Sequence, residues 1–330
     1  MEEKKTRLLR KLRGELGQIV LNALEDPTVI EIMLNSDGSL WIERHGHAMQ
    51  RVGVMSASNA ESLMGTIADA LHTVITRENP ILEGELPLDG SRFEGLLPPI
   101  VSHPTFTIRK KASMVFTMEH YVNQGIMTHE QRISIENAIQ RRANILVVGG
   151  TGSGKTTLAN AIIDSITKIC PNDRLVIIED TAEIQCKAEN TVILRTSVDV
   201  DMLQLLRATM RLRPDRILVG EVRGGEALTL LKAWNTGHSG GVATVHANGA
   251  RAGLIRLEQL IAEASAAGNM APLIAEAIDL VVAIEKTKAS RKIKEIIEVN
   301  GINEMGGYQT QTIKTLSTMI NLKEKEDAAA

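Results

Sequence analysis

The chain has 330 residues, with 37 Lys and Arg against 40 Asp and Glu, a formal net charge of −3, and 43% hydrophobic residues. This composition is typical of a globular protein long enough for about two domains, and it excludes a disordered or collagen-like chain. The near-neutral charge argues against a protein that coats nucleic acid with a uniformly basic surface, but it does not exclude a local basic groove. Aromatic residues make up only 2% of the chain, too few for a row of stacking platforms along single-stranded nucleic acid.

The first segment predicts an amphipathic helix. We expect it to dock on its own domain with its basic face in solvent, because most amphipathic helices face a core. Peripheral contact with the inner membrane is the alternative. The apolar positions are Leu9, Leu12, Leu16, Ile19, Val20 and Leu24, and the basic ones are Lys4, Lys5, Arg7, Arg10, Lys11 and Arg13.

The rest of the N-terminal part mixes strands and helices. Residues 28–55 are typical of short strands, and residues 57–74 have the period of a helix. Residues 86–95 look loop-rich, and residues 105–111 predict one more strand. We therefore predict an α+β domain over residues 1–112.

Strands and helices alternate after an expected linker at residues 113–128. Thr128 is a good N-cap for a helix that begins at residue 129. Continuous apolar strands between helices indicate a parallel sheet covered on both faces, so we predict an α/β domain over residues 129–322 and a solvated tail over 323–330. The predicted strands are 145–148, 175–178, 217–219 and 242–245, with a β-rich cap at 279–284 and 293–300.

Two cysteines, Cys170 and Cys186, are too few for a disulfide framework or a four-cysteine zinc site. No stretch approaches the roughly 18 consecutive apolar residues of a membrane-spanning helix, and the polar start has no signal-peptide core. We therefore expect a cytoplasmic protein.

A phosphate-binding loop follows the first strand of the α/β domain. GGTGSGKT fits the pattern G-x-x-x-x-G-K-[ST] without a mismatch, between a predicted strand and a predicted helix. Glycines let backbone N–H groups turn toward phosphate oxygens, the lysine adds a point charge, and the last hydroxyl suits Mg²⁺. The expected nucleotide-binding residues are Gly149, Gly150, Thr151, Gly152, Ser153, Gly154, Lys155, Thr156 and Thr157.

Polar side chains at three other strand ends would complete a catalytic site, because ligands of doubly wound sheets lie beyond the carboxyl ends of the strands. We expect Glu179 to polarise an attacking water as a base. Glu221, together with Thr156, is expected to hold Mg²⁺ or to orient that water. His246 could donate to the γ-phosphate as a neutral imidazole. The alternatives are a helix-capping role for either carboxylate and a structural role for the histidine.

Phosphoryl transfer also needs an arginine that stabilises developing charge. Each candidate could instead be a solvated surface residue. The candidates, which the residues alone do not rank, are Arg92, Arg109, Arg207, Arg211 and Arg213.

Taken in order, the motifs resemble a known family. GGTGSGKTT, IIEDTAEI, MRLRPDRILVGEVRGGEA and TGHSGGVATVHANGA are similar to the motifs of the traffic ATPases of type II and type IV secretion and type IV pili. LPLDGSRFEG followed by FTIRKKA resembles the N-terminal domain of that superfamily. The small N-terminal domain and the missing four-cysteine element look most like the conjugative-transfer ATPases of the TrbB type.

This resemblance implies a RecA-like P-loop domain, a smaller N-terminal α+β domain, a hexameric ring and ATP with Mg²⁺ as cofactors. By resemblance, Lys155 and Thr156 belong to the P-loop, Glu179 to an acidic box, Glu221 to a Walker B box, His246 to a histidine box, and Arg92 and Arg109 to the arginines that approach the γ-phosphate.

The function implied is cytoplasmic ATP hydrolysis that powers conjugative DNA transfer or type IV secretion, with other components of the apparatus as partners. A helicase-type motor is a rival that the composition does not support, and direct DNA binding stays open. A second rival is a scaffold that binds nucleotide without turnover. The presence of Glu179, Glu221 and His246 argues against it. A small-molecule kinase would need an acceptor motif that the sequence lacks.

Overall fold

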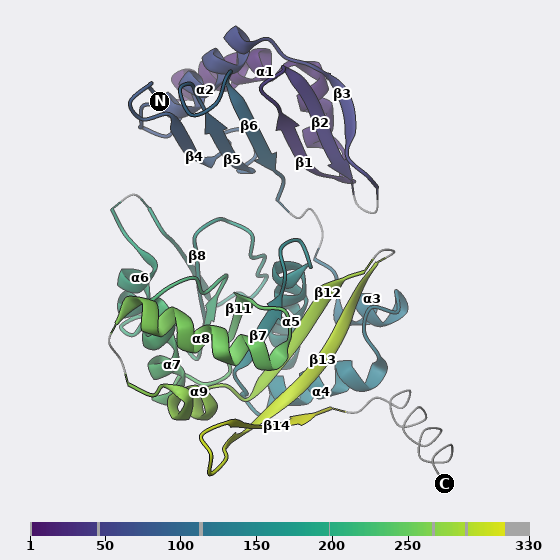
Figure 1. Ribbon diagram of the computed structural model, residues 1–330, viewed down its shortest axis with the longest axis vertical. Coiled ribbons are helices and arrows are strands. Elements are labelled where there is room, and N and C mark those ends of the chain that lie inside the picture. Colours follow the sequence, from purple (N-terminus) through teal and green to yellow (C-terminus); the bar gives the residue numbers. More distant parts are fainter. Residues whose placement is uncertain are drawn as a thin grey trace. The chain divides into compact units, whose positions relative to one another are not determined.

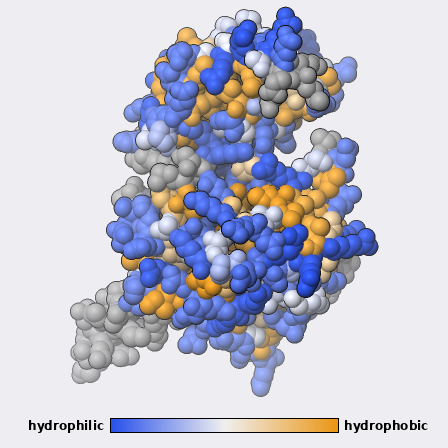
Figure 2. Space-filling view, turned by 180° about the vertical axis from the view of Figure 1, so that it is seen from behind, coloured by the Kyte–Doolittle hydropathy of each residue, from blue (hydrophilic) through white to orange (hydrophobic). Residues whose placement is uncertain are grey.

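The computed structural model describes residues 2–44, 47–111, 115–197, 199–265, 268–287 and 290–313. The chain divides into two compact units, Met1–Ser113 and Met114–Ala330, each with its own sheet. Within the described residues, no helix has both the length and the apolar character needed to cross a bilayer. Apolar and hydrophilic side chains are interspersed over the face of each unit that Figure 2 shows.

The first unit is a six-stranded antiparallel sheet in the order β3-β2-β1-β6-β5-β4, with two helices packed on one face (Figure 1). Its core lies between the helices and the sheet. The elements are α1 (Glu2–Glu25), β1 (Val29–Leu34), β2 (Ser39–Arg44), β3 (Gln50–Val54), α2 (Ala57–Ala70), β4 (Ile81–Glu85), β5 (Arg92–Leu96) and β6 (Thr105–Arg109).

Helix α1 docks on its own unit. Leu12, Leu16 and Val20 are buried in the core, while the described basic side chains of the opposite face, such as Arg10 and Arg13, are exposed. The apolar face of α1 is therefore buried within its own unit, as the sequence analysis expects for this helix.

The second unit is built on an eight-stranded sheet in the order β14-β13-β12-β7-β11-β10-β8-β9. The strands from β12 to β9 are parallel, and β13 and β14 continue the sheet antiparallel. The strands are β7 (Ile145–Gly149), β8 (Leu175–Glu179), β9 (Thr191–Arg195), β10 (Arg216–Val219), β11 (Val242–His246), β12 (Leu280–Lys286), β13 (Arg291–Ile302) and β14 (Tyr308–Thr312).

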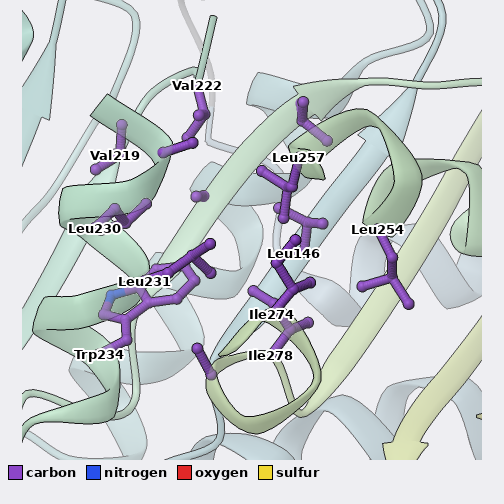
Figure 3. Close-up of a cluster of buried hydrophobic side chains, with 14 of the residues drawn as sticks. Leu146, Val219, Val222, Leu230, Leu231, Trp234, Leu254, Leu257, Ile274 and Ile278 are labelled. Atoms are coloured by element: carbon purple, nitrogen blue, oxygen red, sulfur yellow. The ribbon is translucent and has the colours of Figure 1, made fainter. Parts of the chain in front are cut away.

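Helices cover both faces of this sheet. Alternate residues of β7 point to opposite faces: Leu146 and Val148 join one core, and Ile145 and Val147 join the other. Figure 3 shows the first core, where Leu146 lies beside Leu257 and Ile274, and Leu230 belongs to the same cluster. The helices are α3 (Met118–Asn123), α4 (His129–Gln140) and α5 (Lys155–Ile169) on one face, and α6 (Met202–Thr209), α7 (Glu226–Asn235), α8 (Ala250–Ala264) and α9 (Ala271–Ala277) on the other.

The α/β fold class is confirmed, and three expectations about segments need correction. Residues 115–128 do not form a linker, because α3 buries Met118 and Tyr121 in the core of the second unit. The stretch expected to be loop-rich contains the start of β5, whose Phe93 is buried. The expected β-rich cap is part of the main sheet, since β12 pairs with β7. The predicted tail, 323–330, lies outside the described residues.

Candidate functional site

The glycine-rich loop joins β7 to α5 at the carboxyl edge of the parallel strands. β7 ends at Gly149 and α5 begins at Lys155. Gly152 and Gly154 have φ angles of +67° and +96°, a left-handed conformation that glycine adopts without strain. A Cβ on Gly150 or Gly152 would have no atom within 4 Å, so space is open in front of these residues. The loop therefore has the shape of a backbone nest for an anion.

Lys155 and Ser153 give the nest its side chains. Lys155 is only 7% exposed, and its Nζ donates to the carbonyl oxygen of Gly150 at 3.2 Å. The Ser153 hydroxyl is buried and has no hydrogen-bond partner among the described residues. Thr156 and Thr157 are half-buried in the first turn of α5, and Thr151 is exposed. A buried ammonium beside a helix N-terminus favours a negatively charged ligand.

His246 connects this lysine to Glu221. His246 ends β11, directly opposite Gly149 in the parallel register. Its Nδ1 lies 3.0 Å from Lys155 Nζ, and its Nε2 lies 2.7 Å from Oε1 of Glu221, which comes just after β10. The imidazole of His246 therefore lies between the ammonium of Lys155 and the carboxylate of Glu221. The strand ends thus bring three sequence-predicted residues into one connected group.

Sequence reasoning missed two members of this group, Arg223 and Asp180. Arg223 Nε donates to Glu221 Oε2 at 2.7 Å, and its Nη1 donates to Asp180 Oδ2 at 3.1 Å. Partial burial opposes the change, but the two carboxylates leave the pKa of Arg223 raised, so the guanidinium stays charged. Arg223 was visible only as part of the GEVR motif, and no sequence signal pairs it with Asp180.

Glu179, the last residue of β8, has a different environment. Its side chain is 2% exposed, and its Oε2 accepts from the backbone N–H groups of Glu183 and Ile184 at 3.0 and 2.8 Å. Its Oε1 lies 3.4 Å from Arg195 Nε. Burial raises the pKa of Glu179, and the hydrogen bonds and Arg195 oppose that rise. One oxygen therefore anchors the loop after β8, and only the other faces an ionic partner.

The arginine candidates divide between the units. Arg92 and Arg109 lie opposite each other on β5 and β6 of the first unit, and Arg109 forms an ion pair with Glu31 at 3.3 Å. The group at the P-loop lies wholly in the second unit. The other candidates are exposed on α6 and in the turn after it: Arg207, Arg211 and Arg213.

Comparison with known proteins decides the family. A family model described as "Type II/IV secretion system protein" matches residues 15–316. The chain belongs to the type II/IV secretion system protein family. The recognition made from the motifs is therefore confirmed.

Relatives of this family member differ widely in similarity. It is 57% identical to "Probable conjugal transfer protein TrbB" of Sinorhizobium fredii over 293 residues, 89% of this chain and 90% of the relative. "Type IV secretion system protein VirB11" of Bartonella quintana is 30% identical over 87% of this chain and 95% of the relative. The solved structure of the pilus retraction motor PilT with bound ADP has a TM-score of 0.60 at 18% identity, covering 94% of this chain and 87% of that chain, and shows the fold alone.

Family membership implies use of ATP, and the residues present fit it with Mg²⁺. The open nest, the buried ammonium of Lys155 and the unsatisfied Ser153 hydroxyl suit a polyphosphate. Within the described residues, no group of three or more His, Cys, Asp or Glu side chains could hold a metal ion alone. In proteins, Mg²⁺ is usually held by one or two side-chain oxygens together with phosphates and water. Thr156, in the first turn of α5, and Glu221, after β10, are the residues that would hold the ion.

Proposed function

We propose that the chain hydrolyses ATP to ADP and phosphate. The observation that carries the proposal is the connected group of Lys155, His246 and Glu221, which stands beside the glycine nest at the carboxyl ends of adjacent parallel strands. Phosphate binding alone would need only the nest and its lysine. An imidazole within hydrogen-bond reach of that lysine, and a carboxylate beside the imidazole, add groups that can handle water and protons.

Each residue has a proposed task. The backbone N–H groups of 149–154 and Lys155 bind the phosphates, and the Thr156 hydroxyl and Glu221 hold Mg²⁺, which would neutralise phosphate charge. His246 lies 3.0 Å from Lys155 Nζ and 2.7 Å from Glu221 Oε1, so it can transmit occupation of the nest to the carboxylate.

Glu179 is proposed as the base that polarises the attacking water. Its Oε1 is the oxygen available for this task, because Oε2 is held by two backbone N–H groups. A pKa raised by burial makes this carboxylate a better proton acceptor near neutral pH. Arg92 and Arg109 are proposed to stabilise the charge that develops on the γ-phosphate.

We further propose that this hydrolysis powers conjugative DNA transfer or type IV secretion. The support is family membership and the high identity, over nearly the full length of both chains, to a relative named as a conjugal transfer protein. On the same ground we propose a cytoplasmic homo-oligomer, a hexameric ring, that works with other components of the apparatus.

Two substitutions test the enzyme. Lys155→Ala should abolish ATP hydrolysis while the full chain keeps its fold, because Lys155 is the first residue of α5 and lies outside the apolar cores of the second unit. Glu221→Gln should retain binding of ATP and lose turnover. Hydrolysis by Lys155→Ala at the parent rate would refute the P-loop assignment. Binding by the parent protein without turnover would favour a nucleotide-gated scaffold, and turnover that needs single-stranded DNA would favour a helicase-type motor.

A further inference from the structure

The hairpin between β12 and β13 borders the glycine nest on the side away from His246. The sheet order places β7 between β12 and β11, so the nest has a neighbour on each side. A Cβ added to Gly149 would lie 2.4 Å from the carbonyl oxygen of Ile284 in β12. Backbone contact on this side is therefore close, and the hairpin is part of the wall of the nest.

Arg291, the first residue of β13, reaches the last glycine of the loop. A Cβ added to Gly154 would lie 3.1 Å from Arg291 Cδ and 3.2 Å from its Nε. The stem of the arginine thus packs on the residue that caps α5, and the guanidinium begins within van der Waals range of the loop. The φ of +96° at Gly154 favours glycine at this position, which lets the stem of Arg291 lie against the loop.

The surroundings of Arg291 leave its charge uncompensated among the described residues. Among the residues that the structure describes, no carboxylate forms an ion pair with Arg291, and no hydrogen bond from its guanidinium is found. Its surroundings include the N-terminus of α5 and the phenol of Tyr121, whose pKa is raised by burial against the opposing charge of Arg291. A cation at a helix N-terminus is unfavourable unless an anion joins it.

We propose that Arg291 binds the phosphate chain of the nucleotide, as a second cation on the opposite side of the nest from His246. The inference rests on the proposed function, because the anion is the nucleotide of that site. Arg291 belongs to the same chain as the P-loop and contacts it at the cap of α5. It therefore acts on ground state and transition state alike and strengthens binding without changing the chemical step.

Substitution of Arg291 in the full chain tests this. Arg291→Gln keeps most of the stem on Gly154 and removes the charge. We expect KM for ATP and Kd for ADP to rise about tenfold, the size of one charge-assisted hydrogen bond, with kcat within about twofold of the parent. The dependence of Kd on salt concentration should weaken, and Arg291→Lys should recover part of the affinity. Lys292→Gln, the same change of charge on the next, exposed residue of β13, is the matched control and should leave all values unchanged.

The outcomes separate the two proposals. If Arg291→Gln matches the parent in KM and Kd, or if Lys292→Gln weakens binding equally, Arg291 has no specific contact with the nucleotide. Weaker binding with an unchanged salt dependence would also overturn the inference, because it would indicate that Arg291 contacts the nucleobase and not the phosphates. Failure of the parent protein itself to bind or hydrolyse ATP would instead refute the proposed function.

Discussion

Asp173→Ala should strongly destabilise the second unit, because it leaves a buried arginine without its carboxylate. Arg216, at the start of β10, is 0% exposed, and its Nε donates to Asp173 Oδ2 at 2.6 Å. Its other nitrogens donate to the carbonyl oxygens of Gly240 at 2.9 Å and Ile139 at 3.1 Å. This network ties the segment before β11, and hence the strand that ends in His246, to the rest of the sheet.

The magnitude follows from that burial. Removal of one partner of a buried ion pair costs about 3–5 kcal/mol, and the two remaining carbonyl acceptors place this case near the lower value, about 3 kcal/mol. At about 2–4 °C per kcal/mol for a domain of this size, the melting temperature of the unit should fall by about 6–12 °C. The assay is differential scanning calorimetry of the full chain.

A control and a double substitution make the result specific. Asp164→Ala removes a partly exposed pair with Lys168 on α5 and should change stability by less than about 1 kcal/mol. Asp173→Ala combined with Arg216→Met removes both charges and should be less destabilised than Asp173→Ala alone. A melting temperature for Asp173→Ala within about 2 °C of the parent would refute the reasoning, since the guanidinium would then need no counter-ion.

Two further predictions concern Glu179 and Arg109, for which catalytic roles are proposed. Because burial raises the pKa of Glu179, the folded protein holds this proton to higher pH than the unfolded chain, so stability falls as pH rises from the unfolded value through the folded pKa. Glu179→Gln should flatten that fall in a series of melting temperatures and reduce kcat; an unchanged pH dependence would contradict the burial argument. Arg109→Ala should lower kcat more than it weakens ATP binding, whereas equal losses would indicate a simple binding role. Arg51→Ala, exposed on β3 of the same unit, is the control.

The parallel core could be predicted because its signals are local. The central strands are predominantly apolar, and the glycine motif follows one of them at the position where a P-loop requires it. Helix α3 and strand β5 were missed for physical reasons. α3 is short, so its stability comes from burial of Met118 and Tyr121 and not from its own hydrogen bonds. β5 contains a glycine and is stable as a strand because β4 and β6 pair with it on both sides.

Some residues of the candidate site could likewise be predicted from the sequence, and others could not. Residues at strand ends, such as Glu221 and His246, could be predicted because the topology of a doubly wound sheet determines where strand ends meet. Asp180 and Arg223 could not be paired, since their contact depends on side-chain directions after β8 and β10. Arg291 had no motif at all. It reaches the P-loop because β12 lies next to β7 and β13 turns back beside it, an arrangement of the whole sheet.

The order β12-β7-β11 places different kinds of groups on the two sides of the nest, so substitutions on the two sides should affect different kinetic constants. On the β11 side, His246 lies opposite Gly149 and close to Glu221, so substitutions there act on the groups that are proposed to handle water and should lower kcat. On the β12 side, the hairpin carries Arg291, whose stem packs against Gly154 and whose guanidinium pairs with no carboxylate among the described residues. Substitution of this residue should therefore raise KM. Because β7 separates the two sides, Arg291→Gln and Glu221→Gln should be close to additive when combined. Strong coupling between them would mean that the hairpin also positions the catalytic carboxylate.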